Sequence, residues 1–354
     1  MIDALAARFG GTAYSVVQLA PRLARRPGIN GVCVITRENS MVDRGLRDLP
    51  GVRVLRLAER RPLELVSRVV WEALRLPRRV AAMRPVGLLT FSGMLPRAVP
   101  SPTVAYLCNP LMFSADGRAG DRTRVRAVSR TLARGATAAV PSHGMARLVA
   151  KATGARPAVA PLGVDHSRFT PGPQAGTDVL YVADFYPHKR HDLLLEAWSR
   201  LPAPRPRLRL VGNPDVSPRQ HAEIVRRAGG LSSLGEVTVE RGLSLTELVD
   251  AYRAARVTVV PSTQESFCMP LAETLAAGTP AVARDLPALR ETAGGGARYV
   301  ADDDPERWAA AMAQVLRDDG HHAELRRAGA QHVRRFTWDG LAERLGEALG
   351  LPDR

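Results

Sequence analysis

The alternation of strand and helix is clearest in the segment Val257-Thr-Val-Val-Pro-Ser-Thr-Gln-Glu-Ser-Phe-Cys-Met-Pro-Leu-Ala-Glu-Thr-Leu-Ala-Ala-Gly-Thr-Pro280. Its apolar first part, residues 257–260, predicts a buried strand, and Leu271–Ala277, which a glycine follows, predicts a helix. Glu265 is therefore expected in a strand-to-helix loop. Glu273 is expected near the first turn of the helix.

A loop of this kind is suited to an anion. It directs successive backbone N–H groups and the positive end of the helix dipole at one place, which favours a phosphate, and carboxylates beside it suit sugar hydroxyls. Two glutamates at this spacing are common by chance, and a solvated pair is the plain alternative. The fixed order of strand, Pro-Ser, Glu, Phe, Pro, Glu and Gly-Thr-Pro makes the pattern more specific. We therefore predict a nucleotide-sugar site.

Strand-like runs alternate with helical stretches along the whole chain. Such alternation predicts an α/β protein with two parallel, doubly wound sheets. The segment 169–177, rich in Pro and Gly, is expected to link them. The expected strands are Val32–Ile35, Val52–Leu57, Val86–Thr90, Thr103–Leu107, Ala136–Val140 and Ala158–Pro161, and then Asp178–Val182, Leu208–Val211, Val237–Val239, Val257–Val260, Ala281–Ala283 and Arg298–Val300.

Composition narrows the class of protein. The 354 residues are 45% hydrophobic and 5% aromatic, and this length allows two domains of ordinary size. No run of eighteen apolar residues and no leader pattern occurs, so we expect a cytoplasmic protein, with a peripheral position at the inner membrane face as the alternative. Cys33, Cys108 and Cys268 are scattered and odd in number, which indicates neither a disulfide framework nor a zinc site.

Charge is distributed unevenly. Of the net +15, residues 1–165 carry 26 Lys and Arg against 10 Asp and Glu, or +16, whereas residues 166–354 carry 24 against 25, or −1. A basic half of this kind favours an anionic acceptor or an anionic membrane surface, and a merely solvated surface is the alternative. Residues 53–84 and 118–134 contribute most of the arginines. The stretch 63–76 is either a helix packed on the core or an apolar face beside them.

The segment 257–280 quoted above resembles the donor-binding signature of the retaining GT-B glycosyltransferases of family 4, also described as glycosyl transferases group 1. Pro161-Leu-Gly-Val-Asp165 resembles the family's inter-domain segment, and Arg335-Phe-Thr-Trp338 resembles its C-terminal signature. The resemblance implies two Rossmann-like domains facing a cleft. We expect an acceptor-binding domain at 1–168, a nucleotide-sugar-binding domain at 169–334, and a C-terminal helix at 335–354 that crosses back to the first domain.

The resemblance also implies a reaction. A sugar would pass from a nucleotide-diphosphate-sugar to a hydroxyl of an acceptor, with retention of configuration and without a metal or other cofactor. The leaving phosphate would help to deprotonate the attacking hydroxyl. A GT-B sugar epimerase would need further acid and base residues, and a nucleic-acid-binding protein would be expected to interleave its arginines with aromatic residues. The chain has only 17 Phe, Trp and Tyr, so no nucleic-acid partner is expected.

Lys189 is the first residue to which the resemblance gives a catalytic role. It stands near the start of a helix, where a cation is unfavourable unless an anion shares the site, and a donor diphosphate would be that anion. The family motif usually has an arginine five or six residues earlier, where this chain has Asp184. Arg190 or Arg241 would then supply a second charge. The alternative is a solvated helix face.

Glu265 matches the family's first glutamate, which implies a catalytic residue that forms hydrogen bonds to the donor sugar and stabilises oxocarbenium charge. Glu273 matches the second, which implies hydrogen bonds to the ribose. Between them, backbone amides are expected to bind phosphate, and Cys268 is expected to be a packed thiol rather than a reactive one. Two residues of this loop, Ser266 and Cys268, stand where relatives often have glycine. The expected donor-binding loop residues are Ser266, Phe267, Cys268 and Met269.

In the first half of the chain the predicted site residues follow strand ends. Gly10 and Gly11 lie before a helix expected to begin near Ala13, and their amides are expected to approach the donor or the acceptor. Relatives often have a histidine after the strand 103–107, and here that catalytic role is either unfilled or passes to Asn109. His143 either lines the site or is a simple loop residue. Because few residues precede Gly10, either the first strand is very short or the chain begins inside it.

Overall fold

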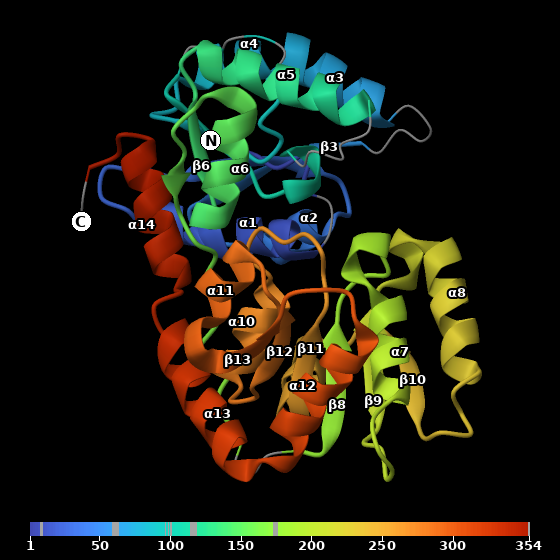
Figure 1. Ribbon diagram of the computed structural model, residues 1–354. Helices are drawn as coiled ribbons and strands as arrows, with labels where there is room; N and C mark the ends of the chain where they lie inside the picture. Colours follow the sequence, from blue (N-terminus) through green and yellow to red (C-terminus); the bar gives the residue numbers. More distant parts are fainter. Residues whose placement is uncertain are drawn as a thin grey trace. The chain divides into compact units, whose positions relative to one another are not determined.

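The computed structural model describes residues 1–7, 10–58, 64–95, 97, 99, 101–113, 119–172 and 176–352. It divides the chain into two compact units (Figure 1). Unit 1 comprises Met1–Gly163 and Phe336–Arg354, and unit 2 comprises Val164–Arg335. The division after Gly163 lies slightly before the expected boundary at Arg168. The expected linker residues 173–175 lie outside the described residues.

Unit 1 contains a seven-stranded sheet in the order β3-β2-β1-β4-β5-β6-β7, and every neighbouring pair is parallel. The expected strands are all present. The strands are β1 (Ile2–Asp3), β2 (Val32–Arg37), β3 (Val52–Leu57), β4 (Leu88–Thr90), β5 (Thr103–Tyr106), β6 (Thr137–Val140) and β7 (Ala158–Val159). The helices are α1 (Gly10–Ala24), α2 (Met41–Gly45), α3 (Glu64–Leu74), α4 (Leu76–Met83), α5 (Ala119–Ala133), α6 (His143–Thr153) and α14 (Trp338–Ala348), with the 3₁₀ turn η1 (Pro110–Phe113).

The start of unit 1 differs from the expectation in one respect. Strand β1 has two residues and lies between β2 and β4, where Ile2 pairs with Val34 and Leu89. Helix α1 begins at Gly10 rather than near Ala13, so the two glycines form its first turn instead of preceding it. Gly10 has φ +61°, a conformation that glycine adopts without steric cost.

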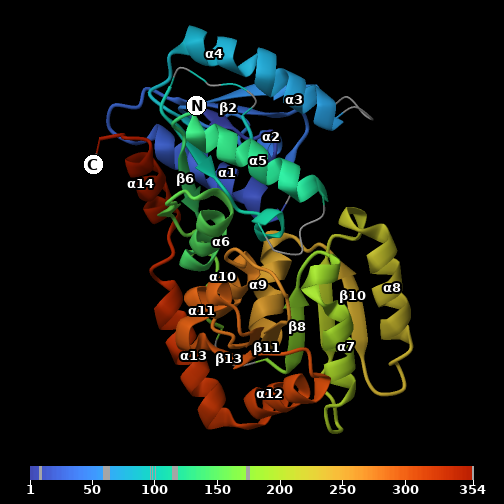
Figure 2. The same cartoon turned by 45° about the horizontal axis from the view of Figure 1, so that its top comes forward.

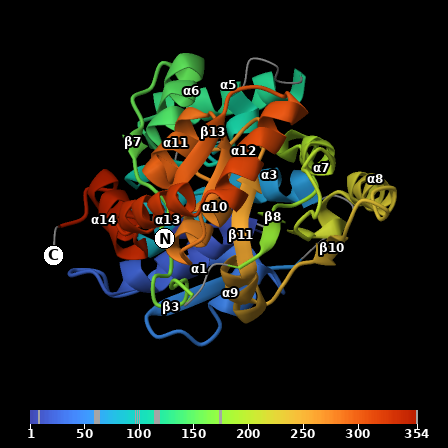
Figure 3. The ribbon, with the colours of Figure 1, turned by 60° about the horizontal axis from the view of Figure 1, so that its bottom comes forward.

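Unit 2 contains a six-stranded parallel sheet in the order β10-β9-β8-β11-β12-β13 (Figure 1), and Figure 3 gives a second view of it with β13, β11, β8 and β10 labelled. The six strands expected from the sequence are all present. They are β8 (Asp178–Val182), β9 (Leu208–Gly212), β10 (Val237–Arg241), β11 (Ala255–Val260), β12 (Ala281–Arg284) and β13 (Ala297–Val300). The helices are α7 (His191–Ser199), α8 (Pro218–Gly229), α9 (Leu245–Ala254), α10 (Met269–Ala276), α11 (Pro287–Ala293), α12 (Pro305–Arg317) and α13 (Asp319–Val333), with 3₁₀ turns η2 (Pro187–Lys189), η3 (Pro214–Val216) and η4 (Gly294–Gly296).

The core of unit 2 explains why its strands are nearly continuous apolar runs. Val257 and Val259 of β11 are fully buried in one cluster with Trp198 of α7 and Trp308 of α12. Helices on both faces of a parallel sheet bury its strands from both sides, which favours Val, Leu and Ala at every position. Burying each large side chain stabilises the fold by roughly 1.5–3 kcal/mol.

Helix α14 is part of unit 1, although it follows unit 2 in sequence. Thr337 caps it by accepting a hydrogen bond from the Gly340 N–H at 3.0 Å. The indole ring of Trp338, 2% exposed, meets the ring of Tyr14 on α1 edge to face at 5.6 Å. Among the helices that the structure describes, none is long and apolar enough to cross a membrane.

Both sheets reverse their strand order at one place. In unit 1 the reversal lies between β1 and β4, and in unit 2 it lies between β8 and β11. In open parallel sheets ligands bind outside the carboxyl ends of the strands at such a point, because the connecting helices pass to opposite faces and leave a space there. The loops that follow β8 and β11 are therefore the first place to look for a site.

Candidate functional site

An ion pair joins the two loops at the reversal point of unit 2. Lys189 ends the turn η2 that follows β8, and Glu265 lies in the loop between β11 and α10. The Lys189 Nζ donates a hydrogen bond to the Glu265 Oε1 at 2.6 Å. The two side chains are 19% and 9% exposed, so the pair is largely buried but open to solvent on one side. Sequence reasoning placed both residues in the donor site without predicting this contact.

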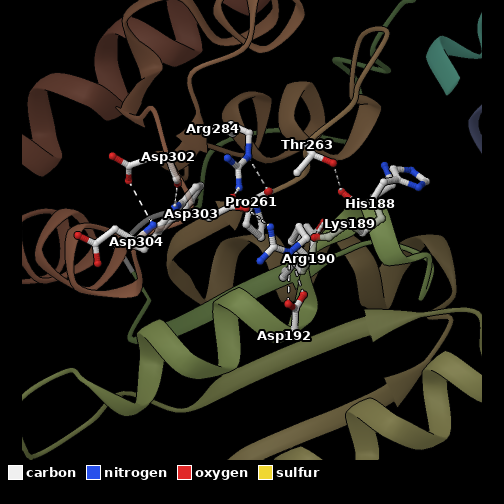
Figure 4. A network of polar contacts seen from close by, with 12 residues as sticks. His188, Lys189, Arg190, Asp192, Pro261, Thr263, Arg284, Asp302, Asp303 and Asp304 are labelled. Atoms are coloured by element: carbon white, nitrogen blue, oxygen red, sulfur yellow. Dashed lines mark hydrogen bonds and ion pairs between the residues drawn. The ribbon is translucent and has the colours of Figure 1, made fainter. Parts of the chain in front are cut away.

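Backbone contacts hold the two loops in register. The Thr263 N–H donates to the His188 carbonyl at 2.8 Å (Figure 4). From β8, the hydroxyl of Tyr181, which is 1% exposed, donates to the Lys189 carbonyl at 2.8 Å and lies 3.0 Å from the Ser262 Oγ. The position of the ion pair is therefore fixed by the sheet rather than by the long lysine side chain alone.

The electrostatics of the pair favour the charged lysine. Burial lowers the pKa of Lys189, but the negative charge and hydrogen bond of Glu265 outweigh it, so that the pKa lies above its ordinary value. Burial and the nearby Lys189 lower the pKa of His188 to about 4, which leaves this imidazole neutral at pH 7. Burial and the charge of Glu265 raise the pKa of the Cys268 thiol well above its ordinary value, so this cysteine stays protonated.

Two residues beside the pair adopt left-handed backbone conformations. Arg190 has φ +53° and Cys268 has φ +73°, and no other non-glycine residue in the described part of unit 2 has a positive φ. This conformation costs an L-residue roughly 1–2 kcal/mol. A left-handed residue after a right-handed one can turn successive N–H groups toward an anion. At Arg190 these groups are already used, since the Lys189 and Arg190 N–H groups donate to the Tyr186 and Pro187 carbonyls at 2.9 and 3.1 Å, so an anion-binding turn is expected at Cys268. Strain of this kind concentrates at functional sites.

The expected phosphate-binding loop lies between Glu265 and α10. Phe267 is 2% exposed, and its carbonyl accepts a hydrogen bond from the Thr292 hydroxyl at 2.6 Å, which anchors the loop to α11. Met269, 9% exposed, is the first residue of α10. Ser266 and Cys268 are partly exposed. In the first turn of α10, Pro270 has no N–H, and the Leu271 and Ala272 N–H groups donate to the Cys268 carbonyl at 3.1 and 3.3 Å, so the donor that this turn offers to an anion is the Met269 N–H.

Glu273 lies on α10 and is 8% exposed. Its Oε2 accepts a hydrogen bond from the hydroxyl of Tyr252, a fully buried residue of α9, at 3.0 Å. Burial raises the pKa of Glu273 to about 7, although the bond from Tyr252 acts in the opposite direction. Tyr252 thus orients one carboxylate oxygen of Glu273 from behind.

Arg190 and Arg241, predicted as alternatives for a second charge, both pair with carboxylates. The Arg190 Nε lies 3.2 Å from Asp192, and its guanidinium also pairs with Asp303. Asp303 in turn pairs with Arg284, whose Nε donates to the Pro261 carbonyl at 3.0 Å (Figure 4). This network neutralises Arg190 and ties the end of β12 to the two loops.

Arg241 is the last residue of β10, and two strands of the sheet separate it from β11. Adjacent strands lie about 4.8 Å apart, so Arg241 is roughly 10 Å from the end of β8. Its exposed guanidinium lies 3.7 Å from Asp215. Among the described residues, the cation in contact with Glu265 is Lys189, and a second charge from Arg190 or Arg241 stays a prediction.

The predicted residues of unit 1 lie at the carboxyl edge of its own sheet. Gly10 and Gly11 are exposed and follow β1, at the reversal point. Asn109, also exposed, follows β5, and its Oδ1 accepts a hydrogen bond from the Leu111 N–H at 3.0 Å. His143 is the exposed first residue of α6 after the neighbouring strand β6. Asn109 and His143 thus follow adjacent strands.

Several residues that shape the site had no recognisable signal in the sequence. Tyr181 and Tyr252 lie in segments whose apolar pattern predicts only core packing. Asp303, which pairs with both Arg190 and Arg284, lies in a loop far from Arg190 in the sequence. Within the described residues, no three His, Cys, Asp or Glu side chains gather into a group that could hold a metal ion.

Known proteins with similar sequences include several of the same name. A D-inositol 3-phosphate glycosyltransferase of Thermobispora bispora is 34% identical over 205 residues, which are 52% of this chain and 48% of that protein. The protein of the same name from Mycolicibacterium smegmatis is 35% identical over 190 residues, which are 50% of this chain and 43% of that protein. The chain spans about half the length of these relatives.

Solved structures match over almost the whole chain. A sucrose-phosphate synthase of Thermosynechococcus elongatus has a TM-score of 0.80 at 21% identity, covering 98% of this chain and 96% of its own. HepE of Anabaena in complex with UDP-glucose has a TM-score of 0.80 at 15% identity, covering 99% of this chain and 98% of its own. These likenesses confirm the predicted GT-B class of fold.

The family match falls on the unit that holds the ion pair. Residues 166–332, which include Lys189, Glu265 and Glu273, match the family described as glycosyl transferases group 1. This match agrees with the resemblance found in the donor-binding segment, and the relatives named above are glycosyltransferases as well. The second unit of the chain is therefore similar to the glycosyl transferases group 1 family.

Proposed function

We propose that this protein is a glycosyltransferase that moves a sugar from a nucleotide-diphosphate-sugar to a hydroxyl of an acceptor. The observation that carries the proposal is the Lys189–Glu265 ion pair at the strand reversal of the family-matched unit. A buried, charged lysine beside helix N-termini suits a diphosphate, and a fixed carboxylate beside it suits sugar hydroxyls. HepE, which shares the fold, was solved with UDP-glucose, and a nucleotide-sugar donor is consistent with that.

The residues of unit 2 divide the work of donor binding in this proposal. Lys189 donates one of its three N–H groups to Glu265 and has no second acceptor among the described residues, so the others can reach the diphosphate. The amides of residues 266–269 bind the same group. Glu265 accepts hydrogen bonds from hydroxyl groups of the sugar. Glu273, oriented by Tyr252, accepts hydrogen bonds from the ribose hydroxyl groups.

The proposed reaction mechanism depends on where negative charge develops in the transition state. As the bond between the sugar and the diphosphate breaks, the leaving phosphate gains negative charge, which Lys189 and the amides stabilise without reorganising. The acceptor oxygen bonds to the anomeric carbon on the face that the leaving group vacates, and its proton passes to the phosphate oxygen. We thus infer retention of configuration and independence from metal, which rest on the family resemblance and on the cation already in place.

The acceptor is proposed to be a phosphorylated polyol. The relatives are named for D-inositol 3-phosphate, and the basic first half of this chain, at +16, would attract an anionic acceptor. The amides of Gly10 and Gly11 are proposed to approach the donor or the acceptor. Asn109 is proposed to take the catalytic role that a histidine often has in relatives, and His143 is proposed to line the acceptor side.

A thermal-shift screen with nucleotide-sugars and free sugar phosphates tests the donor assignment. Binding to the folded state raises the melting temperature by mass action, so one nucleotide series should shift it. The shift should be lost in Glu273→Ala and kept in Glu324→Ala, which removes an exposed carboxylate on α13. No shift with any nucleotide-sugar, or equal shifts in both variants, would contradict the proposal.

A further inference from the structure

Exposed apolar side chains concentrate on helices α3 and α4 of unit 1. Of the ten exposed large hydrophobic residues in the described chain, five lie within residues 69–86: Val69, Val70, Leu74, Met83 and Val86, with exposed fractions from 40% to 59%. Isolated surface hydrophobics need no explanation, but a contiguous group marks an interaction surface. We call this group, with the arginines described next, the α3–α4 face.

The charges on the same face are all positive. Arg75, Arg78, Arg79 and Arg84 are exposed, and none of them forms an ion pair with a described carboxylate. The acidic residue within 68–86 is Glu72, which is 1% exposed and points inward to Arg68, 3.5 Å away. Elsewhere on the surface, arginines commonly pair with neighbouring acids, as Arg226 does with Glu223 at 2.7 Å. Among the side chains that the structure describes, no carboxylate compensates the positive charge of these four arginines.

The geometry of the two helices brings apolar and basic side chains together. The Arg75 N–H bonds to the Trp71 carbonyl and the Arg79 N–H to the Arg75 carbonyl, at 2.8 and 3.0 Å, so the helical path continues from α3 into α4. Figure 2 shows the two helices end to end along the margin of unit 1. Residues four apart share a side of a helix, so the exposed residues Val70, Leu74 and Arg78 align, which places an arginine beside two aliphatic side chains.

The opposite side of the helices is packed and fixes which side faces outward. Leu76 and Val80 are fully buried in a cluster with Ile35 and Leu88 of the sheet, and Trp71 packs against that cluster. For the stretch 63–76, residue 63 and the side chains of residues 64–67 lie outside the description, and the residues that follow include both packed and exposed apolar side chains. Trp71 belongs to the core side, and Val70 and Leu74 belong to the exposed side.

We propose that the α3–α4 face docks the protein on an anionic lipid surface. Arginines pair with lipid phosphates and carboxylates, while the aliphatic side chains between them enter the headgroup boundary, as in amphipathic helices that lie in the membrane plane. A nucleic acid fits less well, because the exposed nonpolar residues of this face are aliphatic and offer no ring on which a base could stack. The inference does not rest on the proposed function, since vesicle binding requires no donor.

Sedimentation of the full chain with vesicles tests the inference. We expect binding to vesicles of phosphatidylcholine mixed with phosphatidylglycerol, and little binding to phosphatidylcholine alone. Raising the salt should weaken but not abolish it, because salt screens the charges and leaves the apolar contacts. A protein that stays in the supernatant with both kinds of vesicle at low salt would overturn the proposal.

Matched variants separate this face from the charge of the unit as a whole. The variant with Arg75, Arg78, Arg79 and Arg84 all changed to Gln should lose affinity for anionic vesicles by on the order of 100-fold or more, because each arginine near the surface contributes about fivefold. The control changes Arg122, Arg124, Arg126 and Arg130 to Gln, four exposed arginines of α5 in the same unit. Equal losses in both variants would show attraction by net charge alone and would overturn the proposal.

A second variant removes the apolar contacts and keeps every charge. Val70→Ser with Leu74→Ser should lower vesicle affinity at least tenfold, and Val225→Ser with Leu234→Ser, at exposed positions of unit 2, should not. All these side chains are exposed, so the unfolding midpoints should stay close to that of the unchanged protein, which urea unfolding checks. Retention of vesicle binding by the Val70 and Leu74 variant would overturn the proposal, as would tighter binding of RNA than of anionic vesicles by the α3–α4 face.

Discussion

Replacing the partners of the Lys189–Glu265 pair should separate its structural role from its chemical one. Lys189→Met removes the ammonium and leaves the Glu265 carboxylate, which is 9% exposed, without its cation. Glu265→Gln removes the charge but keeps an oxygen that can accept the lysine hydrogen bond. The double variant removes both charges. Stability and turnover should respond differently to these three changes.

The expected magnitudes follow from burial and geometry. Breaking a buried ion pair by removing one partner costs about 3–5 kcal/mol, and the 19% exposure of Lys189 places this pair near the lower figure, about 3 kcal/mol. Glu265→Gln should cost less, about 2 kcal/mol, because the hydrogen bond persists. The double variant should be more stable than the sum predicts, with a coupling of about 2 kcal/mol. Turnover should fall at least about tenfold in both variants that lack Lys189, or about 1.4 kcal/mol.

Two assays measure the two effects. Urea unfolding followed by tryptophan fluorescence gives the free energy of unfolding of the four proteins, and release of nucleoside diphosphate from the donor found in the screen gives turnover. The double variant should lose about 3 kcal/mol of stability, less than the sum of the two single losses, while its turnover stays as low as that of Lys189→Met. Additive losses of stability would refute the coupled pair, and turnover within twofold of the unchanged protein in Lys189→Met would refute its chemical role.

Three further predictions concern the same unit. Cys268→Gly should raise the free energy of unfolding, measured by urea titration, by about 0.5–1 kcal/mol, because the gain from removing the steric cost of φ +73° exceeds the larger entropy that glycine loses on folding. Ser266→Gly is the control: Ser266 has no positive φ, so this change should give no stabilisation in the same titration. The raised pKa of Glu273, about 7 against an ordinary 4.5, gives stability that is full below pH 4.5 and is lost as pH rises through 7. Relative to the unchanged protein, Glu273→Gln should therefore gain up to about 3 kcal/mol in unfolding free energy between pH 4 and pH 8, and a pH-independent difference would contradict the buried carboxyl. Transfer should persist in excess EDTA, because Lys189 and amides hold the diphosphate, and loss of turnover that Mg²⁺ restores would contradict independence from metal.

Much of the fold could be predicted because parallel strands buried on both faces leave an unmistakable apolar run. All twelve predicted strands are present, and the strand β11 and helix α10 flank Glu265 as the segment 257–280 indicates. Strand β1 was harder, because two residues give too short a run for a pattern. The start of α1 was misplaced for a physical reason as well: Gly10 and Gly11 are poor helix formers, yet they form its first turn.

The candidate site was predictable in outline but not in its contacts. Glu265 and Lys189 could be placed after successive strands, but their meeting depends on β8 and β11 being neighbours, which the strand order of the sheet decides. The neutralisation of Arg190 depends on Asp303, more than a hundred residues away in the chain. Neither motif spacing nor composition predicts contacts between residues so far apart in the sequence, because these contacts arise from the packing of the whole unit.

The central claim, that Lys189 and the neighbouring amides hold the diphosphate of a nucleotide-sugar, is tested most directly by calorimetric titration with a nucleoside and with its diphosphate. The unchanged protein should bind the diphosphate much more tightly than the nucleoside, because only the diphosphate reaches the charged lysine. Lys189→Met should lose at least about tenfold in affinity for the diphosphate and little for the nucleoside. Equal affinities of the unchanged protein for the two ligands, or an unaltered diphosphate affinity in Lys189→Met, would contradict the account.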